Sequence, residues 1–443
     1  MKNLIFKLLW ALCAVQTAAP AQQEFEMDES ALFGDTAMIV DSEQFTDSAS
    51  IIDEKKQKTV SFSGDIAGSV TGTMNRSYFD DATISNTGYQ STAFSNFNLD
   101  VRLPGAVKSF IDAEAIYYAS NESLDVDLNE MFLDWNIGYN VFFRAGKQVL
   151  QWGRGYFFNP VDLVNVEKTR FLNELGSREG AFGLKVHVPI QTRANLYAFV
   201  DMGKVPRADS LAMAAKAEFL VKSVEFAFSA WGKNKTDPVF GFDFSTGLFD
   251  FMISGEAALH RSITIYTLGD VAIDTTDEQI ALDSKSYDWV PRLSLGIGRY
   301  FDIGDINDRL MINFEGYFNQ AGTDRKDLLP GGLDMRGLTT ENLLEQLPPD
   351  ILPLIFRQNN LSKWYVAAFA TFNRFIISDM TLTANALVNL NQKSAMVQAG
   401  VNYTTLHNLS FDLIVTGFPG PDYTEYTIAG QGMAVELRTG IRF

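Results

Sequence analysis

One stretch of the chain gathers the residue types that could do chemistry, and it is rich in bases, glycine and aromatic rings. It runs from Gly146 to Asn165 and reads GKQVLQWGRGYFFNPVDLVN. Between Arg144 and Arg193 basic residues outnumber acidic ones, although the net charge of the whole chain is -18. A local excess of positive charge in a confined, poorly solvated space concentrates anions. This stretch therefore predicts electrostatic attraction of anions and no covalent chemistry.

We expect the bases here, with neighbouring polar residues, to set charge selectivity at a narrow point. The predicted constriction or selectivity set is Arg144, Gln148, Trp152, Arg154, Lys168, Arg170 and Arg178. The loop aromatics Tyr156, Phe157 and Phe158, with Trp152, offer flat faces for stacking against sugar rings or apolar bodies. Gly153 and Gly155 would free the backbone for unusual dihedral angles. The alternative is a loop that folds inward only to brace its scaffold.

No catalytic, metal or cofactor centre is predicted. The sequence contains no Gly-x-Ser-x-Gly turn, which argues against a serine nucleophile of that kind. Its histidines are scattered along the chain: His187, His260 and His407. Without paired histidines, neither a catalytic base nor a zinc site is indicated. The acidic net charge also argues against nucleic acid as a partner.

The N-terminal region has the pattern of an export signal. Basic residues precede an apolar stretch at 8–15, followed by a small-x-small cleavage pattern around Pro20. We therefore expect a signal peptide at 1–21. The single cysteine, Cys13, lies inside it, so the mature chain would hold no disulfide. Residues 22–57 are acidic and without periodicity, which favours a periplasmic extension or, alternatively, a plug.

The elements that must position the basic stretch are strands, because apolar and polar residues alternate along segment after segment. Segments 96–103, 310–319, 380–389 and 433–443 all alternate with a period of two. That period sorts side chains onto opposite faces of a strand. We count about eighteen such strands from residue 58 onward, with sixteen as the alternative. The connections between them are, for the most part, alternately short turns and long loops. This predicts an all-β, membrane-spanning antiparallel barrel over 58–443.

On this register one face carries charges of both signs and would line a lumen. The inward-facing charges are Asp65, Asp100, Arg102, Asp112, Glu114, Glu130, Asp134, Arg144, Lys185, Asp201, Lys216, Glu218, Asp243, Glu256, Arg292, Glu315, Asp412, Glu436, Arg438 and Arg442. A conduit for fatty acids would need an apolar inner face instead. Barrels of 16–18 strands leave an aqueous channel. The basic stretch then occupies the third outer loop, at about 151–179.

Two features resemble known outer-membrane families. The chain ends on an alternating strand with a terminal aromatic residue, Phe443, as outer-membrane barrels usually do. The run Gly-Lys-Gln-x-x-x-Trp-Gly, followed by Asn-Pro-Val-Asp, is similar to a motif of porin-like proteins and loosely to alginate-export barrels. The resemblance implies a third loop folded into the lumen. It also implies recognition of the last strand by the barrel-insertion machinery, in the outer membrane of a diderm bacterium.

The function that these observations predict is passive diffusion. We expect a porin-like channel for small polar, anionic solutes, constricted by the third outer loop and surrounded by outer-membrane lipid. Neutralising Arg154, Lys168 and Arg170 together should then shift selectivity toward cations. The alternative is a surface-binding or polysaccharide-export or anchoring barrel without an open pore. The substrate and the oligomeric state are not indicated by the sequence.

Overall fold

The computed structural model describes residues 59–76, 87–164, 180–203, 211–234, 236–274, 277–324, 359–405, 408–422, 424–428 and 430–443. The first nine strands are β1 (Thr59–Asn75), β2 (Thr87–Leu103), β3 (Val107–Tyr118), β4 (Ser123–Ile137), β5 (Val141–Gln148), β6 (Ala181–Ile190), β7 (Ala194–Asp201), β8 (Ala212–Val221) and β9 (Val224–Lys233). The others are β10 (Thr236–Leu248), β11 (Phe251–Asp274), β12 (Asp277–Ile303), β13 (Ile306–Asn319), β14 (Trp364–Asn373), β15 (Met380–Asn389), β16 (Ser394–Thr404), β17 (Leu409–Gly417) and β18 (Gln431–Arg442). The described part contains no helix long and apolar enough to cross a bilayer.

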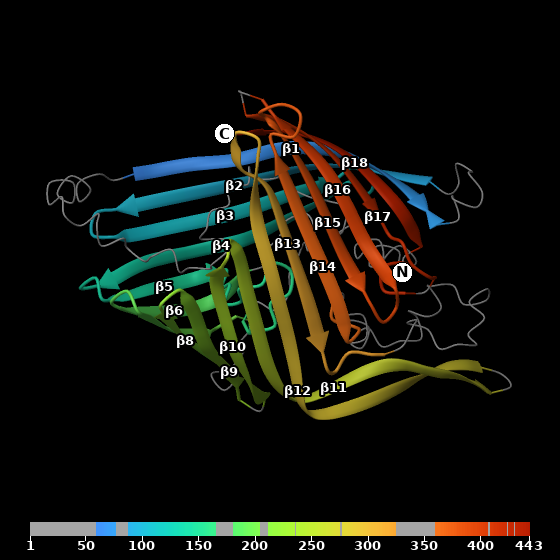
Figure 1. Cartoon of the computed structure of the whole chain (residues 1–443), viewed down its shortest axis with the longest axis horizontal. Helices are drawn as coiled ribbons and strands as arrows, with labels where there is room; N and C mark the ends of the chain where they lie inside the picture. Colours follow the sequence, from blue (N-terminus) through green and yellow to red (C-terminus); the bar gives the residue numbers. More distant parts are fainter. Residues whose placement is uncertain are drawn as a thin grey trace.

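These strands form one antiparallel sheet that closes on itself (Figure 1). Each strand pairs with its neighbours in sequence, and β1 also pairs with β18 along most of its length. At the seam, the Gly64 amide donates to the Phe443 carbonyl at 2.8 Å, and the Phe443 amide donates to the Gly64 carbonyl at 2.9 Å. Closure leaves no unpaired sheet edge for lipid to meet. The prediction of an eighteen-stranded barrel is confirmed, and sixteen strands are excluded.

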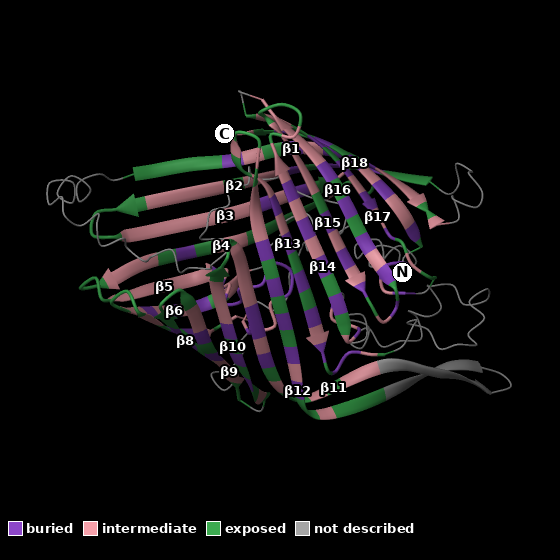
Figure 2. Cartoon of the chain, viewed as in Figure 1, coloured by how far each residue is buried: buried purple, intermediate pink, exposed green. Residues whose placement is uncertain are grey.

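The two faces of the wall differ as the alternation predicted. In β18, Leu437 is 60% exposed on the outside, whereas the next residue, Arg438, is 3% exposed on the inside. The strand register places every predicted inward charge on the same, inner face. Alternating bands of burial along β12 to β16 make this visible in Figure 2. The outer face is therefore apolar and the inner face polar, as a membrane-spanning barrel requires.

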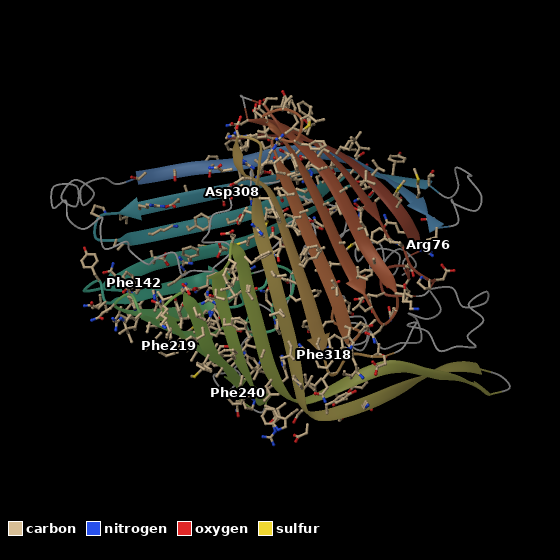
Figure 3. All side chains as sticks on the ribbon, viewed as in Figure 1. Arg76, Phe142, Phe219, Phe240, Asp308 and Phe318 are labelled. Carbon is tan, nitrogen blue, oxygen red and sulfur yellow. The ribbon has the colours of Figure 1, made fainter. Side chains whose placement is uncertain are left out.

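Aromatic side chains gather on the outer face near both ends of the barrel. Phe318 packs against Trp364 with ring centroids 4.6 Å apart, where β13 ends and β14 begins. Trp135 stacks on Phe143 at 5.3 Å, near the β4–β5 turn at the opposite end. Figure 3 labels Phe318 among the side chains that cover the wall. Girdles of this kind lie at the two interfaces of a bilayer, so they bracket the membrane-spanning band.

The connections match the expected rhythm with two corrections. The connection between β11 and β12 is not a loop at first: residues 262–274 and 277–285 continue the ladder of the two strands as a ribbon that extends past the wall (Figure 1). Backbone pairing continues as far as Asp274 and Asp277. Some outer connections are also short, namely those at 119–122, 234–235 and 390–393. The described barrel begins at Thr59, and the expected signal peptide and acidic extension lie outside the described residues.

Candidate functional site

The third outer loop follows β5 and is described over residues 149–164. It folds inward and lies along the inner wall. The Lys216 ammonium of β8 donates to the Trp152 carbonyl at 2.7 Å, while Tyr156 reaches Phe369 of β14 with ring centroids 4.9 Å apart. At its start, the Val149 amide donates to Glu130 of β4 at 2.7 Å. The loop therefore runs along the inner face of the wall from β8 to β14.

Two carboxylates of the inner wall hold the loop by its backbone. Glu256 of β11 accepts the amides of Gly155 at 2.6 Å and Val161 at 3.1 Å. Glu315 of β13 accepts the amides of Phe157 at 2.8 Å and Phe158 at 3.0 Å, and also that of Tyr156. Hydrogen bonds from amides to an ionised carboxylate are stronger than those between neutral groups. These wall acids therefore act as anchors for the loop.

Within the loop, Asp162 closes the chain on itself. Its carboxylate accepts the amide of Trp152 at 2.6 Å and that of Gly153 at 3.0 Å. The same side chain is buried, at 5% exposure. The loop therefore has its own internal brace in addition to the two wall carboxylates.

Arg154 enters an ion cluster on the inner wall. Its guanidinium donates to Asp243 of β10 at 2.7 Å and to Glu225 of β9 at 2.6 Å, and lies 3.5 Å from Glu218 of β8. Lys216 pairs with Glu218 at 2.8 Å. Burial alone would lower the pKa of Arg154, but the facing carboxylates, Asp243 first, raise it above its ordinary value. Arg154 is thus a charged anchor whose charge is compensated by the wall.

The glycines on either side of Arg154 lie where neighbouring atoms leave no room for a Cβ. A Cβ on Gly155 would lie 2.2 Å from the Phe158 carbonyl oxygen, and one on Gly153 would lie 2.8 Å from a Glu256 carboxylate oxygen. Neither glycine has a left-handed φ. The expected freedom for unusual dihedral angles is therefore not what these positions use. They are small so that the loop backbone can reach its carboxylate anchors.

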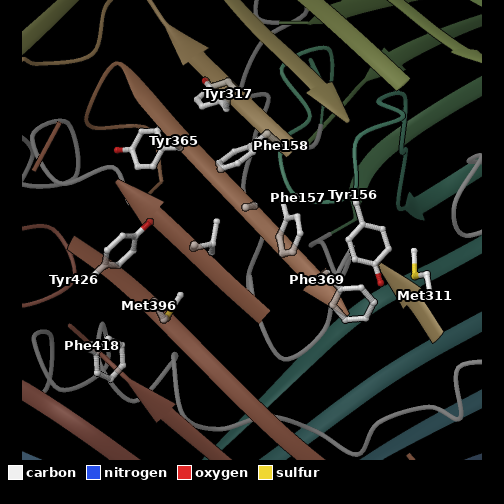
Figure 4. Packing of buried hydrophobic residues seen from close by; sticks show 12 residues of the cluster. Tyr156, Phe157, Phe158, Met311, Tyr317, Tyr365, Phe369, Met396, Phe418 and Tyr426 are labelled. Atoms are coloured by element: carbon white, nitrogen blue, oxygen red, sulfur yellow. The ribbon is translucent and has the colours of Figure 1, made fainter. Parts of the chain in front are cut away.

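The loop aromatics are packed against protein. Phe158 stacks on Tyr317 of β13, with centroids 4.8 Å apart and planes at 7°. Phe157 is fully buried, and Trp152 lies against Phe199 of β7. Figure 4 shows Tyr156, Phe157 and Phe158 among the buried rings of this cluster. This packing matches the bracing alternative, because the faces expected to meet solutes are already covered.

The other predicted residues are only partly brought together. Arg144 forms a two-pronged contact with Asp134 of β4, at 2.7 and 3.0 Å, and its guanidinium lies 3.8 Å from the Phe132 ring centroid. Gln148 is fully buried and donates to the Gly183 carbonyl at 3.3 Å. These contacts lie on the β4–β6 wall, whereas those of Arg154 lie on β8 to β10. Lys168, Arg170 and Arg178 fall outside the described residues.

Two functional features were missed by the sequence reasoning. Glu225 is absent from the predicted inward charges, although it lies on the same inner face of β9 as Ala227 and Ser229. The wall acids were predicted to face inward but not to bind the loop. One signal was present: the loop concentrates bases, whereas Glu218, Asp243, Glu256 and Glu315 concentrate acid on the inner face. Charge complementarity between the two could have predicted their contact.

Three further outer segments pack together beside the third loop. Glu425, between β17 and β18, accepts hydrogen bonds from the Tyr365 hydroxyl at 2.9 Å, the Asn389 amide group at 2.7 Å and the Asn359 backbone amide. Its own amide donates to Gln392 at 2.7 Å. Burial raises the pKa of Glu425 to about 7, although these hydrogen bonds oppose the shift. The Glu425 carboxylate therefore joins segment 424–428 to Asn359 and to β14 and β15, and its backbone amide adds a link to Gln392.

Comparison with known proteins is informative only at the level of the fold. No family model matches the sequence, and no curated protein matches it. Nor is any group of histidine, cysteine or acidic residues suited to a metal found in the described part. The resemblance to alginate-export barrels is not confirmed by these comparisons.

Solved structures of bacterial porins do match. A BenF-like porin from Pseudomonas fluorescens Pf-5 has a TM-score of 0.50 and 8% identity, covering 87% of this chain and 98% of that chain. Pseudomonas aeruginosa OccK5 (OpdH) has a TM-score of 0.49 with 8% identity and the same coverage. Salmonella typhi OmpF in complex with daunomycin has a TM-score of 0.44 and 10% identity. The chain therefore has the fold of bacterial porins, a closed antiparallel β-barrel of eighteen strands.

Proposed function

We propose that this barrel is a porin-like channel that lets small polar solutes diffuse across the outer membrane, narrowed by its third outer loop. The observation that carries the proposal is the anchoring of this loop across the inner wall by Glu256, Glu315 and the Arg154 cluster. Barrels of this strand number leave an aqueous channel, and a loop fixed inside it sets the width of the passage. Charge and width would then select solutes without an energy-coupling step.

The proposed preference for anions rests on bases other than Arg144 and Arg154. Arg144 and Arg154 have carboxylate partners within 3 Å, so their positive charge is largely compensated. The preference therefore depends on Lys168, Arg170 and Arg178, which lie outside the described residues. It remains a prediction that conductance measurements with a salt gradient would decide.

A second candidate is a surface-binding or polysaccharide-anchoring barrel. It is favoured by the packing of outer segments around Glu425, which places Phe418 and Tyr426 in the same buried cluster as the loop aromatics. Such segments could restrict the passage and present a binding surface instead. A folded barrel that conducts nothing would support this candidate over the channel.

The test is single-channel conductance in a planar bilayer, with and without the wall anchors. Replacing Glu256→Gln and Glu315→Gln together removes charge-assisted hydrogen bonds worth about 1.5–3 kcal/mol each. We expect the loop to loosen and the conductance to rise. Asp412→Asn is the matched control, because that wall carboxylate of β17 accepts a hydrogen bond from Asn402 of the neighbouring β16 at 2.7 Å. Equal conductance in the wild type and the double variant would contradict the constriction.

The same bilayer assay addresses ion preference. Neutralising Arg154, Lys168 and Arg170 together should move the reversal potential toward cation selectivity if the loop bases attract anions. An unchanged reversal potential would remove these bases from the selectivity mechanism, while leaving the channel itself in place.

A further inference from the structure

A cavity of about 300 Å³ opens on the inner wall near the turns of β4–β5, β6–β7 and β8–β9. Arg154 of the third loop lines it together with side chains of β5 to β9. The turns mark the end of the barrel opposite the outer loops, so the cavity lies on the periplasmic side of the loop. A solute that has passed the loop would meet it next.

The cavity carries two opposite charges, one in the β6–β7 turn and one on β9. Arg193, in the β6–β7 turn, is exposed, and no ion pair engages it among the residues that the structure describes. Its carbonyl accepts the Leu220 amide at 2.9 Å, and Leu220 is in turn the register partner of Glu225. Strand spacing therefore puts the Arg193 and Glu225 backbones roughly 10 Å apart. Both residues belong to the inward-facing parity.

Glu225 retains room for a ligand although it binds Arg154. Its side chain is 29% exposed, whereas that of Arg154 is 3% exposed. One carboxylate can accept several hydrogen bonds, so an ammonium group could join the Arg154 contact. The site would thus offer an acceptor for a cation and, across the cavity, a donor for an anion.

Beside these charges, on β5 to β7, the wall is aromatic and held in place. His187 stacks on Tyr197, with centroids 4.5 Å apart and planes at 11°, and its ring nitrogen Nε2 lies 3.0 Å from the Asn195 side-chain oxygen. Phe142 adjoins it at 5.8 Å. Such faces suit the apolar part of a small solute that carries a charge at each end.

We propose that this cavity binds a small zwitterion of amino-acid to dipeptide size, with its carboxylate on Arg193 and its ammonium on Glu225. As a binding site it does not depend on conduction; only its role as a subsite for a transported solute rests on the proposed function. Equilibrium binding to detergent-solubilised barrel therefore separates the two. If the barrel conducts but binds no zwitterion, the binding site proposed here is wrong and the channel function is unaffected.

The probe is alanylphenylalanine, titrated by calorimetry against its N-acetylated form and its C-terminal amide. The free dipeptide should bind about tenfold more tightly than either blocked form, because each blocked form lacks one of the two charges that the site would pair. Arg193→Gln should abolish the advantage over the amide, and Glu225→Gln the advantage over the acetylated form. Heat-modifiable migration would verify that each variant is folded.

Lys222→Gln is the matched control, because it removes an exposed base from the adjacent turn that does not line the cavity. It should leave all three affinities unchanged. The proposal is overturned if the free dipeptide binds no better than its blocked forms. It is also overturned if Lys222→Gln weakens binding as much as Arg193→Gln does.

Discussion

At the scale of single residues, the inner wall uses its acids as fasteners. Glu256 and Glu315 accept backbone amides of the third loop, and Asp243 pairs with Arg154. Ionised groups taken out of water are costly unless they are paired and hydrogen-bonded. Here each carboxylate finds donors from a loop that itself needs partners for its amides. The loop and the wall therefore satisfy one another's polar groups.

The glycine next to Arg154 provides a direct test of this close approach. In Gly155→Ala the new methyl group would lie 2.2 Å from the Phe158 carbonyl oxygen, so the loop backbone must move. We expect a loss of about 1–3 kcal/mol in the free energy of unfolding, as for other overpacked sites. Faster proteolysis within the loop should accompany it. Gly232→Ala, where nothing lies within 4 Å, should be nearly neutral.

The facing of the wall acids could be predicted from the sequence, but their contacts could not. Alternation along a strand was sufficient to place Asp243, Glu256 and Glu315 inside, because the period of two depends only on local geometry. Their partners could not be predicted in this way. The Gly155 amide and Glu256 are 101 residues apart, and they meet only because the sheet closes and the loop crosses it. For the same reason the burial of the loop aromatics was not evident from their spacing.

At the scale of elements, the outer segments around Glu425 form a cluster held by one titratable group. Glu425 takes its donors from Asn359, Tyr365 of β14 and Asn389 of β15, so its charge state affects all three contacts. Its folded pKa of about 7 lies above the ordinary value of 4.5. An acid shifted in this direction favours the folded cluster when it is protonated. The stabilising contribution is present below about pH 4.5 and is lost as the pH rises to 7.

We therefore expect the cluster to loosen as the pH rises. Amide hydrogen exchange in segments 390–393 and 418–428, corrected for the intrinsic effect of pH, should show less protection at pH 8 than at pH 5. Glu425→Gln keeps the shape of the neutral acid and should be insensitive to pH over this range. If the wild type and the variant respond alike, Glu425 does not govern the cluster.

At the scale of the whole molecule, the alternation along the strands gives the wall one face for lipid and one for water. Each strand presents apolar residues to lipid and polar residues to the lumen, so adjacent positions meet opposite environments. Fold class, strand count and lumen-facing charges could all be predicted, because they depend on that repeated local pattern. The ribbon of β11 and β12 could not, since continued pairing beyond the wall leaves little trace in the alternation.

Two consecutive residues of β15 test this separation. Ala384 is exposed on the outer face, and Thr383 faces the lumen. Ala384→Arg should destabilise the folded barrel in lipid by about 2–4 kcal/mol, the cost of arginine near the bilayer midplane. Thr383→Arg introduces the same group on the lumen side and should cost much less. Reversible folding into liposomes, followed by tryptophan fluorescence, measures both; equal losses would contradict the assigned faces.

The seam between β1 and β18 has a consequence for how the chain matures. The contacts of Gly64 with Phe443 join the first strand to the last residue. No partially delivered chain can therefore complete the ring, and each intermediate has two unpaired edges with an apolar belt between them. Such edges are templates for wrong pairing. The pairing of β18 with β1 is thus the step that removes both edges, and loss of part of β18 would leave a sheet whose edges stay unpaired.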